Sequence, residues 1–294
     1  MTSPREWRER LDDAGLAGSF LVRDLDDGSE LALDADVELP IASLVKLPLA
    51  LATLERVRRG ELDGAEPVEV APGRVDTPGP TGITRFRHPA RVAVDDLVYL
   101  STSLSDSTAT DALFDLTPPT QVSAVLRELG VDGFTLRHRM DVLMATPAEA
   151  LDGGLRHDLA IGVTGRGGGS PIAELDVARA NTATARALAG LLTAIWTGDA
   201  IDPGVTARLR QLLAANVHRN RLAPEFVSDA SAWSSKTGTL LNLRHEAGVV
   251  EHADGGRFVV VALTRSRVAA AAQPAAEIAM GRIARGLHDE LRGR

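Results

Sequence analysis

The order of the predicted elements limits what this chain can fold into more than any other feature. Strand-like segments lie near both ends, and the segments between them are mostly of helical spacing. The predicted strands are Ser19–Arg23, Glu30–Leu33, Trp233–Leu240, Glu246–His252 and Arg257–Thr264. The predicted helices are Pro4–Ala14, Ser43–Arg59, Val92–Leu100, Ser107–Phe114, Thr120–Leu129, Thr182–Trp196, Pro203–Ala215 and Pro274–Leu291. Terminal segments that form one sheet around a helical insertion predict an α/β sandwich joined to an all-helical subdomain.

The length of 294 residues allows one large domain or two interleaved ones. We assign residues 1–60 and 203–294 to the α/β sandwich subdomain and residues 61–202 to the helical subdomain. The helical part includes an irregular, glycine-rich, omega-like loop at about 140–181, and loops of that length are usually functional or disordered. We expect ligands to bind in the cleft between the two subdomains.

Composition excludes several classes of function. No apolar run approaches the roughly 18 residues that a membrane span needs, so no membrane is expected as a partner. The net charge of −8 argues against a nucleic-acid partner, because nucleic acids select basic faces. The absence of cysteine excludes disulfides and thiolate metal sites. The 7 histidines lack zinc-binding spacing, so we expect them at the surface or in loops, with no metal and no cofactor.

The N-terminal segment bears on localisation. It is charged and lacks the apolar run and small-residue cleavage site of a signal peptide. As written, the chain is therefore expected to be cytoplasmic. If a leader has been trimmed and Met1 is new, we expect a secreted or periplasmic protein instead.

Lysine usage singles out two positions. Of 32 basic residues, only Lys46 and Lys236 are lysines, and all the others are arginines. At exposed positions this bias is most simply mutational, since both residues solvate a surface about equally well. A position that keeps lysine needs something arginine lacks. A buried lysine can lose its proton and act as a base, whereas arginine cannot.

Ser43 and Lys46 form an S-x-x-K motif at the start of a predicted helix. Residues three apart lie on one helix face, so the amine can reach the hydroxyl. A serine hydroxyl becomes a good nucleophile when a neighbouring base takes its proton, and a desolvated lysine can be that base. Backbone N–H groups at the helix start favour a developing oxyanion. Alone, the motif also fits an N-cap serine beside a solvated lysine.

Two further triplets complete a set. Ser105-Asp106-Ser107 precedes a predicted helix, and Lys236-Thr237-Gly238 follows a strand-like segment. In the second triplet, Lys236 and Thr237 offer a cation and a hydroxyl to a substrate carboxylate, and the glycine lets a substrate backbone approach closely. Each triplet alone could be an ordinary N-cap or strand end. The order S-x-x-K, S-D-x, K-T-G, at separations of roughly 60 and 130 residues, matches the signature of class A β-lactamases and penicillin-binding proteins.

The chain therefore resembles the class A β-lactamases, within the penicillin-recognising serine hydrolase superfamily, over nearly its whole length. The resemblance implies an α/β, β-lactamase/transpeptidase-like fold, with an antiparallel sheet flanked by helices plus an all-helical subdomain. It implies that Ser43 is the acylated nucleophile, Lys46 its activating neighbour and Ser105 the relay of a proton to the leaving nitrogen.

The same resemblance implies a substrate-binding set. Lys236 and Thr237 would hold the substrate carboxylate. The backbone N–H groups of Ser43 and Thr239 would form the oxyanion hole. Ser107 stands where the family has Asn in S-D-N, so contact with a substrate amide is expected to be weaker. The arginine that assists carboxylate binding is left open among Arg219, Arg221 and Arg244.

The deacylation base is the main departure from the family. Arg139-Met140-Asp141 resembles the family's Arg-x-Glu, with Asp141 where the water-activating Glu is expected. Arg139 would then face Asn181 across the neck of the loop, where the family has an Asp. Glu174 is the competing base, and either carboxylate could instead be a solvated loop residue. If neither works, the enzyme acylates and stalls.

The first hypothesis for function is a serine hydrolase that acts through a covalent acyl-enzyme, with hydrolysis of β-lactam amides. The alternative is a penicillin-binding, D-aminopeptidase-type or esterase-type protein that forms the acyl-enzyme but deacylates β-lactams poorly. A non-catalytic binding protein on the same fold is a third possibility. The expected partner is a small molecule, a β-lactam or a related amide or ester with a carboxylate.

Overall fold

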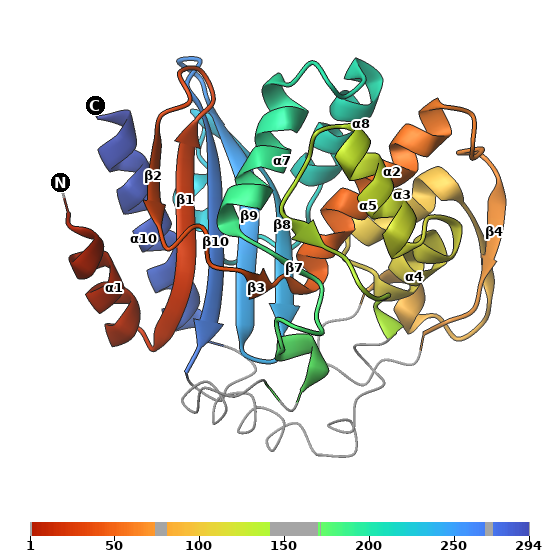
Figure 1. Cartoon of the computed structure of the whole chain (residues 1–294), viewed down its shortest axis with the longest axis horizontal. Helices are drawn as coiled ribbons and strands as arrows, with labels where there is room; N and C mark the ends of the chain where they lie inside the picture. Colours follow the sequence, from red (N-terminus) through yellow and green to blue (C-terminus); the bar gives the residue numbers. More distant parts are fainter. Residues whose placement is uncertain (1, 74–80, 142–169, 171, 268–272, 294) are drawn as a thin grey trace.

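A central sheet built from both ends of the chain organises the fold (Figure 1). The computed structural model describes residues 2–73, 81–141, 170, 172–267 and 273–293. The sheet is antiparallel, with the strand order β2-β1-β10-β9-β8. Its strands are β1 (Leu16–Asp24), β2 (Glu30–Leu33), β8 (Ser231–Leu240), β9 (Leu243–His252) and β10 (Arg257–Ser266). This arrangement confirms the predicted sheet.

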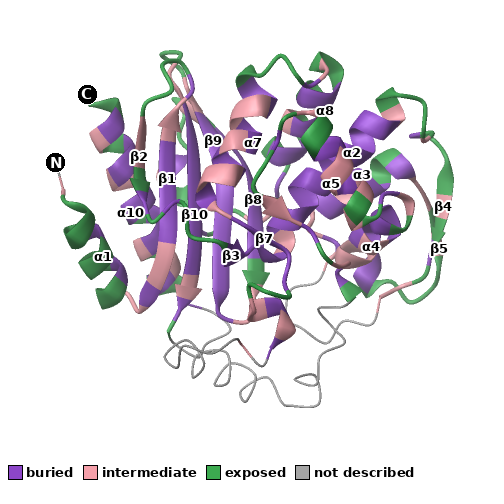
Figure 2. Cartoon of the chain, viewed as in Figure 1, coloured by how far each residue is buried: buried purple, intermediate pink, exposed green. Residues whose placement is uncertain are grey.

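Helices cover both faces of the sheet (Figures 1 and 2). On one face lie α1 (Pro4–Asp13), α9 (Ala223–Phe226) and α10 (Pro274–Arg292), which share an apolar core with alternate side chains of the strands. A capping box between Ser3 and Glu6 begins α1. On the other face, α7 (Ala185–Thr197) packs against β1 and β10 and links the sheet to the helical part of the chain.

The helical part carries its own section of the core, continuous with the second face of the sheet. The helices packed together here are α2 (Lys46–Arg58), α3 (Val94–Ser103), α4 (Ser107–Leu116), α5 (Pro119–Glu128) and α8 (Pro203–Ala214). Of these, α2 and α8 fall within the ranges 1–60 and 203–294 that the sequence assigned to the sandwich subdomain, and that division stays a prediction. The almost wholly buried α2 contacts α3, α5 and α8 and is the centre of this part. Among the described residues, no helix is both long and apolar enough to span a membrane.

Several short elements were not predicted. No element was predicted between Arg59 and Val92, but β4 (Pro67–Val70) pairs with β5 (Ala90–Ala93), and the 3-10 helix η2 (Gly82–Arg85) lies between them in the sequence. A small sheet joins β3 (Leu39–Pro40), β7 (Thr182–Ala183) and β6 (Phe134–Thr135). Strands of two to four residues leave too short a pattern for periodicity to detect. Most of the predicted loop at 140–181 lies outside the described residues.

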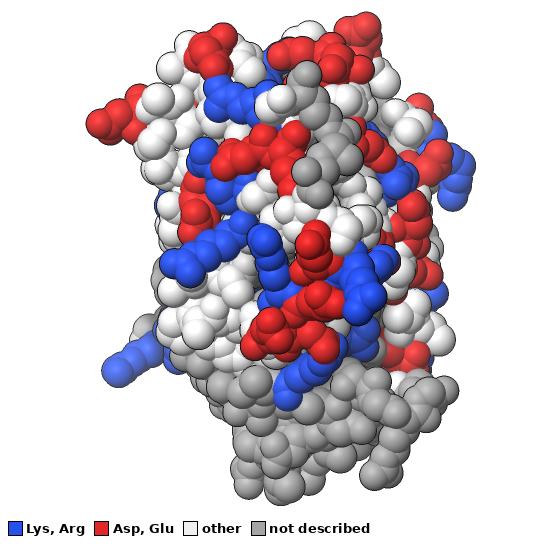
Figure 3. Space-filling view, turned by 90° about the vertical axis from the view of Figure 1, so that its left-hand side faces the viewer, with Lys and Arg blue, Asp and Glu red and all other residues white. Residues whose placement is uncertain are grey.

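The surface formed by α1, α10 and their neighbours carries charges of both signs. Figure 3 shows acidic and basic side chains side by side on the side of the molecule where α1 and α10 lie. Ion pairs such as Arg285–Asp289 on α10, and Arg292 with Asp254 of the β9–β10 turn, contribute to this mixture. On this face, the net negative charge of the chain is thus spread rather than gathered in one patch.

Candidate active site

The turn that carries Ser43 lies against strand β8. Residues Ala42–Val45 form a 3-10 helix, η1, and α2 begins at Lys46, so the predicted single helix has a tighter first turn. Ala42 has a positive φ of 47°, a conformation that non-glycine residues adopt at a cost and that is frequent at functional sites. Within the part of the chain that the structure describes, the Ser43 hydroxyl makes no hydrogen bond. It is thus available to an incoming group.

Gly238 explains how close this turn and the strand can be. A Cβ atom at this position would lie 2.8 Å from the carbonyl oxygen of Ile41 and 3.2 Å from Cγ of Leu44. The glycine of K-T-G therefore lets the turn that carries Ser43 approach β8. From the sequence, this glycine was expected to let a substrate backbone approach closely. The structure shows a second reason for glycine here, which is a close contact within the chain that leaves no room for a side chain.

Lys46 is completely buried and points at the S-D-x segment. Its Nζ lies 2.7 Å from the backbone oxygen of Ser105, and 3.3 Å from the hydroxyl oxygens of both Ser105 and Ser107. Burial lowers the pKa of Lys46 to about 7, while the carboxylates of Asp106 and Asp111 act in the opposite direction. A substantial fraction of this amine is therefore neutral near neutral pH, as a general base requires.

Asp106 fixes the conformation of the S-D-x segment. Its buried carboxylate caps α4 by accepting hydrogen bonds from the N–H groups of Thr108 and Ala109. It also accepts from the N–H of Ile83 at 2.5 Å and the hydroxyl of Thr84 at 2.6 Å. Ser105, immediately before it, has a positive φ of 59°. Asp106 is therefore the N-cap of α4, and this cap lies directly after the Ser105 backbone with its positive φ.

Lys236 reaches the same hydroxyl as Lys46. Its Nζ lies 3.0 Å from Oγ of Ser105 and 2.9 Å from the backbone oxygen of Thr237. Burial, together with the positive charges of Lys46 and Arg221, lowers the pKa of Lys236 well below its usual value, and Glu246 acts in the opposite direction. The structure thus brings the three sequence motifs together around one serine hydroxyl.

Arg221 is the arginine that the structure places at the K-T-G strand. Its Nη1 donates to the backbone oxygens of Gly238 and His245, at 2.9 and 2.7 Å, and its Nη2 donates to the hydroxyl of Thr239 at 2.5 Å. Glu277 of α10 lies 3.1 Å from its Nε. This buried guanidinium adds positive charge beside Thr237 and Thr239.

The other two candidate arginines have different surroundings. Arg219 is exposed, and its guanidinium donates to the backbone oxygens of Ala214 and Trp233. Arg244 is buried and donates to the backbone oxygens of its own hairpin, at Leu241 and Leu243. Of the three arginines, Arg221 is thus the one that bonds to Gly238 and Thr239, the residues of β8 that follow Thr237.

The start of the predicted loop differs from the expected pairing. Arg139 pairs with Asp115 and, at 3.5 Å, with Asp141, so the expected contact with Asn181 is wrong. Asn181 instead accepts hydrogen bonds from the backbone N–H groups of Arg137 and His138. An amide can bond to backbone donors and acceptors at once, which an aspartate cannot.

The two candidate bases have opposite environments. The side chain of Asp141 is 58% exposed, as the solvated-carboxylate reading anticipated. Glu174 lies in the 3-10 helix η6 (Ala173–Leu175) and is buried, so it is not a solvated loop residue. Asp111 of α4, which was not predicted, accepts from the N–H of Met140 at 2.6 Å. Burial raises the pKa of Asp111 to about 6; the N–H of Met140 acts against this rise, and the charge of Asp141 acts with it.

The histidines are not all at the surface, contrary to expectation. His245 and His288 are fully buried. The Nε2 of His245 lies 3.0 Å from the backbone oxygen of Pro40, and its Nδ1 accepts from the N–H of Thr264 at 3.0 Å. The first contact ties the chain just before the Ser43 turn to β9. No group of three or more metal-ligating side chains occurs among the residues that the structure describes.

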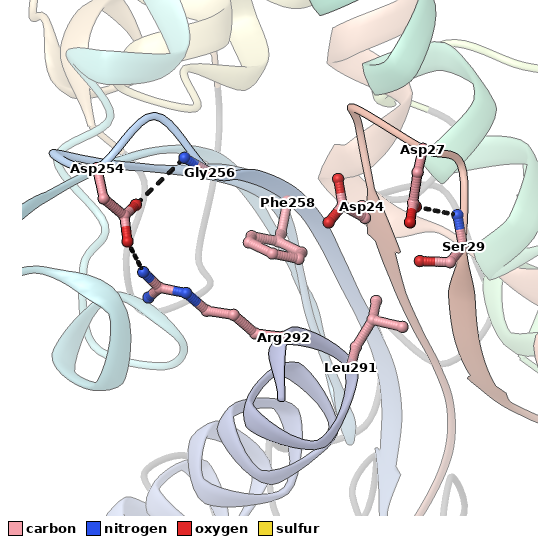
Figure 4. Close-up of a pocket in the computed structure, with 8 residues that line it drawn as sticks. All are labelled: Asp24, Asp27, Ser29, Asp254, Gly256, Phe258, Leu291 and Arg292. Carbon is pink, nitrogen blue, oxygen red and sulfur yellow. Dashed lines mark hydrogen bonds and ion pairs between the residues drawn. The ribbon is translucent and has the colours of Figure 1, made fainter. Parts of the chain in front are cut away.

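A pocket of about 350 Å³ lies elsewhere (Figure 4). It is lined by residues of the β1–β2 and β9–β10 turns and the end of α10, with Asp24, Asp254 and Arg292 among them. Lys236 and Gly238 lie toward the opposite end of β8 and β9, near the turn at 241–242. This pocket is thus separate from the candidate active site.

Comparison with known proteins agrees with the fold and the motifs. The model of a family described as the Beta-lactamase enzyme family matches residues 5–291. The chain belongs to this family. The match to this family covers nearly the full length of the chain, as the resemblance to class A β-lactamases implied.

Relatives of this family member include a regulator and enzymes. The Beta-lactamase regulatory protein BlaB of Streptomyces cacaoi is 60% identical, over 98% of this chain and 97% of that protein. A solved β-lactamase of Sphaerobacter thermophilus DSM 20745 is similar with a TM-score of 0.76 and 22% identity, covering 99% and 97% of the two chains. A mutant of PBP-A in an acyl-enzyme complex with penicillin G gives a TM-score of 0.76 at 18% identity, covering 99% and 96%. The solved structures confirm the fold.

Proposed function

We propose that this protein forms a covalent acyl-enzyme at Ser43 with β-lactams or related amides and esters that carry a carboxylate, and that it releases the acyl group slowly. The observation that supports it most is the convergence of Lys46 and Lys236 on the Ser105 hydroxyl, beside the turn that carries Ser43. This arrangement supplies the parts that acylation needs.

Acylation would proceed as follows. The Ser43 oxygen attacks the substrate carbonyl and forms a C–O bond, while its proton passes to the neutral amine of Lys46. The negative charge on the carbonyl oxygen is stabilised by the N–H groups of Ser43 and Thr239, each typically contributing about 3 kcal/mol. When the C–N bond breaks, Ser105 gives its proton to the leaving nitrogen and regains one from a neighbouring lysine. Lys236, Thr237 and Arg221 hold the substrate carboxylate meanwhile.

Deacylation needs a second base beside the ester carbonyl. Asp141 is the proposed base, but its carboxylate is exposed and lies near the guanidinium of Arg139. It is also one methylene shorter than the Glu of class A enzymes. A misplacement of about 1 Å can cost roughly a hundredfold in rate. We therefore expect hydrolysis to be much slower than acylation.

A slow acyl-enzyme suits a protein that reports on β-lactams better than one that destroys them. The 60% identical relative is named a β-lactamase regulatory protein, and this name carries no statement of hydrolysis. A regulatory role of the same kind is therefore part of the proposal. A full β-lactamase activity is the competing function, favoured by the family and its solved members.

Gel fluorescence with a fluorescent penicillin tests the acylation step. The wild-type protein is expected to carry the label, and the Ser43→Ala variant is expected to carry none because it lacks the attacking oxygen. Ser123→Ala is the matched control, since this serine bonds within α5 and lies outside the site. Equal labelling of wild type and Ser43→Ala would contradict the proposal.

A further inference from the structure

A fully buried carboxylate, Glu246, lies behind the K-T-G strand. It is the direct cross-strand partner of Thr237 in the β8–β9 pair. Its Oε1 accepts hydrogen bonds from Nε1 of Trp233 at 2.8 Å and from the hydroxyl of Ser235 at 2.7 Å. Its Oε2 accepts from the backbone N–H of Leu222 at 2.8 Å. Burying a carboxylate is costly, so a position that holds one with three donors needs an explanation.

The donors identify what Glu246 holds together. Ser235 directly precedes Lys236, and Leu222 directly follows Arg221. Oxygen atoms of one carboxylate therefore bridge two separate segments, each next to a cation of the candidate site. Alternate residues of a strand share a face, so Trp233, Ser235 and Thr237 lie on the Glu246 side of β8.

The charges around Glu246 are unequal. The positive charges of Lys46 and Arg221 both act to lower the pKa of Lys236. Oε1 of Glu277, on α10, lies 3.1 Å from Nε of Arg221. Burial raises the pKa of Glu246, whereas its hydrogen-bond donors and Arg221 lower it. In turn, the Glu246 carboxylate acts to raise the pKa of Lys236.

We propose that Glu246 is a positioning residue for the carboxylate-binding end of the site. By bridging Ser235 and the N–H of Leu222, it keeps Lys236 and Arg221 close together and supplies the negative charge that offsets their repulsion. Ligands with a carboxylate gain from this arrangement, whereas ligands without one do not depend on it. The inference rests on the proposed function only in taking a carboxylate-bearing ligand for the site.

Binding of two small boronic acids tests the role without any β-lactam. Phenylboronic acid and 3-carboxyphenylboronic acid both add reversibly to a serine hydroxyl, and they differ only in the carboxylate. The ratio of their dissociation constants, measured by calorimetry, gives the contribution of the carboxylate. In Glu246→Gln the amide has to place an N–H group opposite one of the three donors, and the buried charge is lost.

In Glu246→Gln we expect the advantage of the carboxylated compound to fall roughly tenfold, while binding of phenylboronic acid changes less than about threefold. Ser235→Ala removes one hydrogen bond to Glu246 and should shift the ratio in the same direction, but by less. This variant replaces Glu246→Gln in the test if Glu246→Gln fails to fold. Glu55→Gln is the control, since this buried carboxylate pairs with Arg58 and Arg59 on α2. It should leave the ratio unchanged.

Three results would overturn the inference. They are an unchanged ratio in Glu246→Gln and Ser235→Ala, an equal loss of affinity for both compounds, and no carboxylate advantage in the wild type. A different result would contradict the proposed function alone. If the carboxylate advantage depends on Glu246 but no β-lactam acylates Ser43, the positioning role stands and the substrate class is wrong.

Discussion

The amines of Lys46 and Lys236 lie 3.3 and 3.0 Å from one oxygen, the hydroxyl of Ser105. These are the chain's two lysines, and each is fully buried. Two like charges on either side of one hydroxyl repel, so this arrangement favours a state in which one amine is neutral. Ser105 can then donate to the neutral amine while it accepts from the charged one. In the proposed acylation, this geometry would supply both a base and a route for the proton.

The state of Lys46 sets the pH dependence of acylation. Its pKa of about 7 means that protonation removes the base as the pH falls. We expect the second-order rate constant for acylation by benzylpenicillin to fall about tenfold for each pH unit below 7, and to level off above it. Quenched-flow mass spectrometry between about pH 5 and 8 would measure this. A rate independent of pH below 7 would rule out the neutral amine as base.

The contact of Gly238 with the nucleophile turn predicts a coupling of stability and activity. In Gly238→Ala, the new Cβ would lie 2.8 Å from the carbonyl oxygen of Ile41, so the turn has to move. We expect a loss of about 1–3 kcal/mol in the free energy of unfolding, with slower acylation.

The control for this variant is Gly190→Ala. Gly190 lies within α7, and apart from the neighbouring backbone of its own helix, a Cβ there would meet no atom within 4 Å. Alanine should therefore stabilise the helix by about 0.5–1 kcal/mol and leave acylation unchanged. Urea unfolding and penicillin labelling measure both quantities. If the two variants behaved alike, the close approach of Ile41 to β8 would not be what requires glycine.

Two of the three candidate arginines, Arg221 and Arg219, make a matched test of carboxylate binding. Arg221→Lys keeps the charge but loses the bonds to Gly238, His245 and Thr239. We expect roughly tenfold weaker binding of a carboxylate-bearing β-lactam before acylation. The exposed Arg219→Lys should bind as the wild type does. Saturation kinetics separate binding from the acylation step, and equal effects of both variants would argue against Arg221.

Much of the fold could be predicted from the sequence, because long elements carry long patterns. The helix at Pro274 and the strands around the Asp254-Gly255-Gly256 turn had enough residues for their periodicity to be clear, and they are where it placed them. The two-residue strands and the 3-10 turn at Ser43 were missed because a few residues contain no period. Tertiary contacts, rather than local preference, form these short elements.

The site could be predicted where spacing carried the information. Three motifs, each uninformative alone, predicted that Lys46, Ser105 and Lys236 would meet, and they do. The choice of Arg221 and the burial of Glu246 could not be predicted, since each depends on which strand lies beside which. Alternation in β9 gives no signal for Glu246, because four of the other nine residues of the strand, Arg244, His245, Glu251 and His252, are also polar.

Lengthening Asp141 tests the explanation for slow turnover. Asp141→Glu restores the missing methylene, so its carboxylate can extend further toward the acyl-enzyme. We expect the acyl group to be lost roughly tenfold faster or more, with acylation unchanged. Asp141→Asn should lengthen the lifetime of the adduct. Decay of the penicilloyl adduct, followed by intact mass, reports this rate, and a lifetime indifferent to both substitutions would exclude Asp141 as the base.

The central claim is a Ser43 acyl-enzyme that forms readily and breaks down slowly. It is tested most directly by intact-mass spectrometry of the wild-type protein over time after mixing with benzylpenicillin, alongside colour change with nitrocefin. The account predicts an adduct of one penicillin on Ser43 that persists while little nitrocefin is turned over. Rapid, repeated nitrocefin turnover with at most a transient adduct would mean an efficient β-lactamase, and no adduct and no turnover would mean that β-lactams are not its substrates.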